Sequence, residues 1–404
     1  MKLKIENMNS IALALLVLSG LTGYLCQYLR ISSSFLTMNM IVVIIAVGLS
    51  LVQRMKRKTY NISTRMGVYV IYLTLMVIWG IYIKQSDYSI LQFIMYVLSA
   101  AIISSGDFKI EYVLRILTFS SLLFVPFYDR VFQLTYVTLN QANMGTMYKL
   151  LNIVVAGIIH FTFFRQGQKK VIWLGYVGCA VLLVGILSRA NRGVVLSVLF
   201  LLVVCLLNGH ARLEKTKSIR NKKRFYVMLI AIIAIVIGIN FNSIILWAFN
   251  TWGKFSSSIP SFLVKMNKYI MLNDTSNGRN EVYEIAFKLI SQHPIFGIGI
   301  ENFGKYYTVN YPHNFVLQLL IEGGPLFLIV PLMSSLYLLF YTIYEFVENR
   351  ELRACLVFMI SLMLPRFLVS LDIWTYYEFW IPVFFMITRI KQVKESCALN
   401  TEEV

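Results

Sequence analysis

The stretch IVVIIAVGLSLVQRMKRK, at residues 41–58, decides the class of fold, because an apolar run passes directly into a cluster of Arg and Lys. A helix needs about 20 mainly apolar residues to cross the hydrocarbon core of a bilayer, which is about 30 Å thick. Short loops rich in Arg and Lys stay on the cytoplasmic side of the membrane. The stretch therefore predicts a transmembrane helix that ends at the cytoplasmic face.

The composition of the whole chain leads to the same class. Of its 404 residues, 58% are hydrophobic and only 14% are charged, and the mean hydropathy is +0.69. Soluble domains carry roughly a quarter charged residues, so a soluble protein is excluded. The formal net charge of +18 would indicate nucleic acid as the partner of a soluble protein. On a membrane protein this charge first orients the helices, and we expect no nucleic-acid partner.

Apolar windows recur along the chain, and they predict an all-α polytopic membrane protein with about 12 transmembrane helices. The predicted spans are 10–29, 34–52, 67–83, 89–104, 112–128, 147–164, 171–187, 192–208, 225–247, 323–345, 354–370 and 376–391.

The basic loops set the orientation of these spans. The loops 54–58, 165–170 and 212–224 are separated by even numbers of spans, so all three predict that both termini are cytoplasmic. The predicted parts are a nine-span bundle at 1–247, a large outer loop at 248–312, a re-entry segment with the last three spans at 313–391, and a cytoplasmic tail at 392–404.

The outer loop between spans nine and ten is long for a compact protein, which is typical of a functional loop. Within it, the apolar residues of 280–292 fall on one face of a helix, and Pro294 then ends that helix. Downstream, we expect His313 and Asn314 to begin a short helix that ends at Gly323 and Gly324, after which Pro325 starts the next span.

Several kinds of chemistry lack their usual residues. The chain has no Walker motif, no GxGxxG after a strand, no HExxH and no paired acidic motif. We therefore expect neither a bound metal nor a cofactor. The predicted spans also lack an acidic residue near a midplane, which disfavours a proton- or sodium-coupled transporter.

The candidate functional residues are cationic and lie at the outer ends of spans, where the positive-inside rule disfavours them. They are Arg189 and Arg192 in the SRANRG stretch at 188–193, Arg279 at the start of the loop helix, His313, and Arg366 in the eleventh span. Arginine offers a bidentate, permanently charged fork, and a lipid headgroup with two phosphates would fit such a set. The alternative is that each Arg side chain extends to ordinary lipid phosphates at the interface.

Two runs of the outer region resemble a known family. The run GRNEVYEIAFKLISQHPIFGIGIENF at 278–303 and the run PHNFVLQLLIEGGPLFLIVPL at 312–332 resemble the signature of the O-antigen polymerase and O-antigen ligase superfamily. Its elements are an Arg before the loop helix, an HPxxGxG turn, and an HN pair that leads through E-x-G into a span. The stretch at 188–193 is similar to the Ser-Arg-x-x-x-Gly element of the same family.

The resemblance implies a GT-C-like membrane glycosyltransferase that needs no metal and works at the outer face of the bacterial cytoplasmic membrane. Its donor would be an oligosaccharide on undecaprenyl diphosphate. Arg279 and His313 would be catalytic, with His313 either a ligand of the diphosphate or the general base on the acceptor hydroxyl. Arg189, Arg192 and Arg366 would bind the diphosphate. Asn314 and Glu322 would support the site, or Glu322 would only shape the helix break.

The resemblance favours a polysaccharide polymerase of O-antigen, capsule or exopolysaccharide, which extends another lipid-linked repeat unit. Its expected partners are a flippase and a chain-length regulator of the same pathway. A ligase of the same superfamily is the alternative. A flippase for lipid-linked oligosaccharides is a third possibility, but it should show two repeated halves, and here the long outer loop lies in the second half only.

Overall fold

The computed structural model describes most of the chain, and the statements below concern these residues only. They are 7–28, 35–58, 63–86, 88–127, 141–166, 168–189, 192–209, 225–226, 228–229, 240–255, 261–271, 279–344, 347, 349–368 and 372–398.

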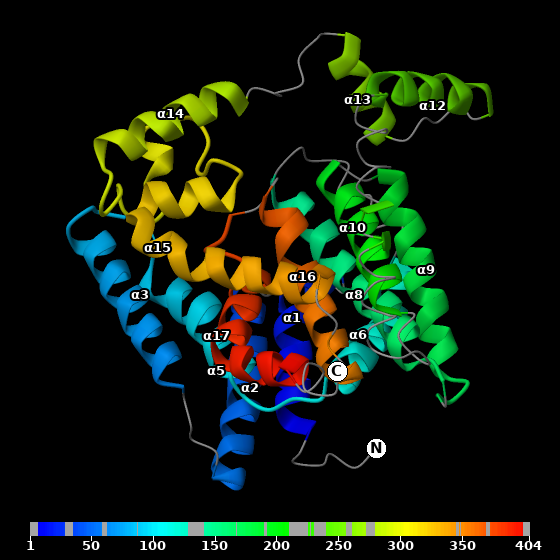
Figure 1. The fold of residues 1–404 in the computed structure, drawn as a ribbon, viewed down its shortest axis with the longest axis horizontal. Coiled ribbons are helices and arrows are strands. Elements are labelled where there is room, and N and C mark those ends of the chain that lie inside the picture. Colours follow the sequence, from blue (N-terminus) through cyan, green and yellow to red (C-terminus); the bar gives the residue numbers. More distant parts are fainter. Residues whose placement is uncertain are drawn as a thin grey trace.

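The described part of the chain is all-α and contains no strand (Figure 1). Its longer helices are α1 (Met8–Tyr28), α2 (Phe35–Arg57), α3 (Thr64–Tyr82), α6 (Ile110–Phe124), α8 (Gln141–Phe164), α9 (Ile172–Arg189), α10 (Arg192–Gly209), α12 (Phe241–Phe255), α13 (Ser261–Met271), α14 (Arg279–Gln292), α15 (Phe315–Leu339), α16 (Arg350–Phe367) and α17 (Tyr377–Ala398). The short segments are α4 (Ile90–Gln92), η2 (Phe93–Leu98), α5 (Ser99–Ser104), η3 (Val125–Phe127), η4 (Phe303–Lys305) and η5 (Phe340–Tyr344).

The predicted class, an all-α membrane protein, is confirmed. By length and composition, four described helical stretches can cross a bilayer, at 37–57, 64–82, 147–164 and 315–344. Other predicted spans correspond to shorter apolar helices, and the predicted ninth span at 225–247 lies largely outside the described residues. The count of twelve therefore stays a prediction, as does the GT-C-like architecture.

Helix α8 lies at the centre of the bundle and packs against α1, α6, α9, α10 and α16. Between Met147 and Phe164 nearly every residue is buried, which is what a helix that is apolar all round requires. Helix α17 packs against α5, α15 and α16. It continues to Ala398, so the first part of the predicted tail at 392–404 belongs to this helix.

Helices α12 and α13 pack on each other at the same end of the molecule as α14 but apart from it, while α2 reaches the opposite end (Figure 1). Helix α14 runs from Arg279 to Gln292 and buries Val282, Ala286 and Leu289, which confirms the amphipathic helix predicted at 280–292. Which of these ends faces the cytoplasm stays a prediction.

Helix α15 contains the predicted break. Its backbone leaves helical geometry at Gly324, where φ is 71° and ψ is −168°, and Pro325 follows directly. The short helix that begins after Asn314 therefore ends at this point, and the span begins after it. The candidate site lies around the short helix.

Candidate functional site

The turn that follows α14 packs directly against the break in α15. Its glycines Gly297 and Gly299 have φ values of 69° and 96°, in the left-handed region that favours glycine. A Cβ at Gly297 would collide with the carbonyl oxygen of Ile321, and a Cβ at Gly324 would collide with that of Ile295. The glycines of the HPxxGxG turn and of the helix break therefore allow two backbones to touch.

The turn donates backbone N–H groups to carbonyl groups of α15 at the helix break. Because Pro325 has no N–H, the carbonyl of Ile321 has no helical partner four residues on. The N–H of Ile298 donates to this carbonyl at 2.7 Å, and the N–H of Gly299 donates to the carbonyl of Glu322 at 3.0 Å. The turn thus satisfies buried acceptors at the break, and the two segments hold each other in place.

The carboxylate of Glu322 makes further hydrogen bonds at this contact between the turn and α15. It is buried, and it accepts hydrogen bonds from the backbone N–H of Glu301 at 3.2 Å and from Nε2 of Gln318 at 3.2 Å. The indole N–H of Trp374 donates to its other oxygen. These hydrogen bonds are the ones expected of a residue that shapes the helix break, and whether Glu322 also supports the site stays a prediction.

Asp372, in the loop before α17, extends this network. Its carboxylate accepts from Nε2 of Gln318 at 2.5 Å, from Oγ1 of Thr375 at 2.9 Å and from the backbone N–H of Trp374 at 3.3 Å. Burial raises the pKa of Asp372, although these hydrogen bonds act in the opposite direction. The network therefore ties α15 to the loop that leads into α17.

His313 and Asn314 stand at the entrance to α15. The side chain of Asn314 caps the helix, because its Oδ1 accepts from the N–H groups of Val316 and Leu317 at 2.9 and 3.3 Å. His313 precedes the cap with a positive φ of 56°, and its ring lies 4.4 Å from that of Tyr311 in an edge-on arrangement. The cap and the turn together fix where the imidazole of His313 lies.

Tyr311 is a direct neighbour of His313, because their ring centres lie 4.4 Å apart. Burial raises the pKa of the Tyr311 hydroxyl, the carboxylate of Asp372 raises it further, and the positive charge of Arg279 acts in the opposite direction. His313, at the start of α15, therefore contacts Tyr311, and Arg279, at the start of α14, acts on the same hydroxyl through its charge.

Arg366 lies inside the bundle. It is only 1% exposed, donates to Oδ1 of Asn152, and its guanidinium lies 5.8 Å from the ring centre of Tyr148. In this arrangement the Arg366 guanidinium faces protein groups.

A second buried cation, Lys149, accompanies Arg366. Its Nζ lies 2.7 and 2.9 Å from the two carboxylate oxygens of Glu378, and Nδ2 of Asn152 donates to the same carboxylate at 2.8 Å. The ammonium also lies 5.1 Å from the ring centre of Tyr376. Helices α8, α16 and α17 are thus joined by one polar cluster of two cations, one carboxylate and one amide.

Arg189 ends α9 and Arg192 begins α10, so the structure places both at the junction of two helices, as predicted. Their side chains lie outside the described part of the structure. Their predicted contact with a diphosphate stays a prediction.

Sequence reasoning missed part of this cluster. Lys149, Asn152, Glu378, Asp372 and Tyr311 carry none of the predicted roles. A signal for the first three existed in the sequence, because a Lys, an Asn and a Glu inside apolar helices need partners to be buried.

Among the described residues, no group of three His, Cys, Asp or Glu side chains lies close enough to hold a metal ion. The predicted independence from metal is a statement about the reaction, and it stays a prediction.

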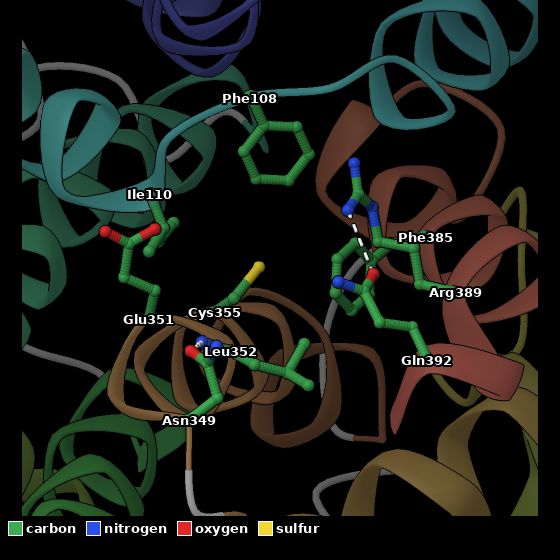
Figure 2. Close-up of a pocket in the computed structure, with 9 residues that line it drawn as sticks. All are labelled: Phe108, Ile110, Asn349, Glu351, Leu352, Cys355, Phe385, Arg389 and Gln392. Carbon is green, nitrogen blue, oxygen red and sulfur yellow. Dashed lines mark hydrogen bonds between the residues drawn. The ribbon is translucent and has the colours of Figure 1, made fainter. Parts of the chain in front are cut away.

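A cavity of about 170 Å³ opens elsewhere, between the start of α16 and the second half of α17 (Figure 2). Arg389 lines it and donates to Gln392 at 3.2 Å, the bond drawn in the figure, and to Asp107 at 3.2 Å. Cys355 of α16 also lines the cavity. It is eleven residues from Arg366 along α16, which corresponds to about 16 Å at 1.5 Å per residue. The cavity is therefore separate from the candidate site.

The fold and the site define a polytopic membrane protein with a cationic site where its loop helix meets a broken span. The sequence matches the model of the O-antigen ligase family, Wzy_C, over residues 131–332, which is half of the chain. The protein belongs to this family, as the resemblance of its outer runs predicted. It is therefore a glycosyltransferase-like membrane enzyme of the O-antigen ligase or polymerase type, in the bacterial inner membrane. No curated protein matches the sequence.

Proposed function

We propose that the protein is a polysaccharide polymerase. It transfers an oligosaccharide from undecaprenyl diphosphate to another lipid-linked repeat unit at the outer face of the cytoplasmic membrane. The alternative is a ligase that transfers finished glycan to a different acceptor, and it is favoured by the name of the matching family, O-antigen ligase.

One observation supports a site for a lipid diphosphate at this place. The ring of His313 lies against that of Tyr311, the positive charge of Arg279 acts on the same tyrosine hydroxyl, and Arg366 and Lys149 add two buried cations inside the bundle. Arg366 and Lys149 carry two positive charges and Glu378 carries one negative charge, so this buried cluster keeps one net positive charge. A region of fixed positive charge that is shielded from water stabilises a leaving group that departs as a diphosphate.

The reaction needs one bond to form and one to break. The oxygen of an acceptor hydroxyl attacks the anomeric carbon of the donor sugar, and the bond from that carbon to the phosphate oxygen breaks. The diphosphate leaves with the electron pair of that bond. The hydroxyl proton passes to the imidazole of His313, if His313 is the base, because an unperturbed imidazole accepts protons near neutral pH.

The arginines would hold the diphosphate. Arg279, at the first turn of α14, would contact it together with Arg189 and Arg192 from the junction of α9 and α10. Arg366 would join them by exchanging its bond to Asn152 for one to a phosphate oxygen. Guanidinium groups suit this role because their paired N–H groups match phosphate oxygens.

The deciding experiment places the purified protein in liposomes with lipid-linked repeat units as the only substrate. We expect long glycan chains on the lipid carrier, separated by gel electrophoresis. Products that form only after a second kind of acceptor is added would identify a ligase and contradict the polymerase.

The same assay tests whether a metal is needed. Because the reaction as proposed uses no metal, EDTA should leave the rate unchanged. Loss of activity with EDTA and recovery with magnesium would contradict this point.

Variants test the site in the same assay. Arg279→Ala and His313→Ala should abolish chain extension while the amount of protein in the membrane stays normal. Lys288→Ala is the matched control, because Lys288 is an exposed cation on the same helix as Arg279. If both site variants still made long chains, the assignment of the site would be wrong.

A further inference from the structure

Helix α3 presents one continuous apolar face to the outside of the protein. Its buried residues pack on the bundle, while the exposed large side chains follow one another at helical spacing of three and four residues. The exposed residues are Val68, Ile71, Leu75, Ile78 and Tyr82. Because 64–82 is one of the stretches that can span a bilayer, this face contacts lipid.

The end of α3 also shows where the helix leaves the hydrocarbon. Trp79 and Tyr82 lie in its last turn, and Lys84 follows with its ammonium 5.4 Å from the ring centre of Trp79. Aromatic rings of this kind gather at the level of the lipid headgroups, and lysine side chains extend from there toward water. This end of α3 therefore marks the membrane interface.

The HPxxGxG turn is fastened to that end of α3. Nδ2 of Asn302 donates to the carbonyl of Lys84 at 3.0 Å, and the hydroxyl of Ser86 donates to the carbonyl of Ile300. The ring of Phe296 lies 6.3 Å from that of Trp79. The tip of the turn is thus held at the depth of the interfacial aromatic residues.

The tip of the turn, formed by Ile295 and Phe296, is apolar and exposed. Ile295 is 61% exposed and Phe296 is 56% exposed, although both belong to a loop that is otherwise rich in polar groups. Through the contact of Phe296 with Trp79, they extend the apolar surface at the end of α3, where Ile83 is also exposed. A water-facing loop tip would gain nothing from two large apolar side chains.

We propose that Ile295 and Phe296 insert into the lipid bilayer and anchor the turn at the membrane interface. The partner of this surface is the acyl region just below the headgroups. The anchor fixes the depth of the broken helix α15, because the same turn is hydrogen-bonded to the carbonyls of Ile321 and Glu322. The site is thereby kept at the depth of lipid headgroups.

The test measures where the tip lies, independently of any activity. Single cysteines replace Ile295 or Phe296, and Glu284→Cys serves as the control, because Glu284 is exposed on the polar face of α14. The native cysteines are removed first, Cys26 and Cys397 by change to Ser and the buried Cys179, Cys205 and Cys355 by change to Ala, and the protein is then spin-labelled in liposomes. Collision with oxygen, which concentrates in lipid, is compared with collision with a water-soluble nickel chelate.

At positions 295 and 296 we expect a ratio of oxygen to nickel collisions several-fold higher than at position 284. A ratio equal to that of the control would mean that the tip faces water, and it would overturn the proposal. Low collision with both reagents would mean that another protein surface covers the tip, which would overturn it as well. Neither outcome bears on the proposed transferase activity, which is measured separately.

Discussion

The buried ion pair between Lys149 and Glu378 makes the energetics of the site testable. Glu378→Gln keeps the volume of the side chain but removes its charge, which leaves Lys149 and Arg366 buried without a counter-ion. At the 2.7 Å separation of the pair, with an effective dielectric constant of about 20, the lost attraction is about 6 kcal/mol. Because removing the carboxylate also removes its own desolvation cost, we expect a net loss of about 3–5 kcal/mol of stability.

The measurement is unfolding of the purified protein in mixed micelles by titration with SDS. Lys149→Met in the Glu378→Gln background removes the unpaired ammonium and should recover a large part of the loss, since the two residues are in direct contact. Glu284→Gln, at an exposed position of α14, is the control and should leave the midpoint unchanged. If Glu378→Gln unfolded like the parent, or if the two substitutions were simply additive, the cluster would not act as an ion pair.

Three further expectations concern the outer loop and the helix break. Asn314→Ala removes the cap of α15, so the free energy of unfolding in the same titration should fall by about 1 kcal/mol. Chain extension should continue at a reduced rate. A variant that is stable but inactive would instead indicate that Asn314 has a direct chemical role. Gly297→Ala places a Cβ on a residue with left-handed backbone geometry and against the neighbouring backbone, so it should lower both stability and activity. Gly48→Ala is the control and should be tolerated, because no atom lies within 4 Å of the added Cβ. Cysteines introduced at exposed positions of 248–312 should react with a membrane-impermeant reagent from outside; reaction only after the inner membrane is permeabilised would reverse the predicted topology.

Local patterns predicted the parts of the fold that are determined locally. The apolar runs indicated helices such as α3 and α8, and the spacing of Val282, Ala286 and Leu289 indicated the buried face of α14. The break at Gly324 was predictable because Gly and Pro act through their own backbone conformations. The candidate cations were chosen because they stand against the positive-inside rule on the predicted topology, and their outer position and role stay predictions.

The contacts that assemble the site were not predictable in this way. Glu378 lies 229 residues from its partner Lys149, and the averaging of hydropathy over a window hides a single charge in an apolar helix. The donors that Ile298 and Gly299 give to α15 depend on two segments meeting in space, and no spacing along the chain reports it.

The ion pair of α8 and α17 also has a consequence for how the protein is made. Lys149 enters the membrane while Glu378 has not yet been synthesised. Because Lys149 is only the third residue of the span 147–164, its ammonium can extend to the interface and avoid the cost of about 2.5–3.5 kcal/mol that a Lys has at the centre of an inserting helix. In ribosome-bound chains that stop short of α17, Lys149 should therefore remain accessible to water, and it should become buried when α17 supplies Glu378.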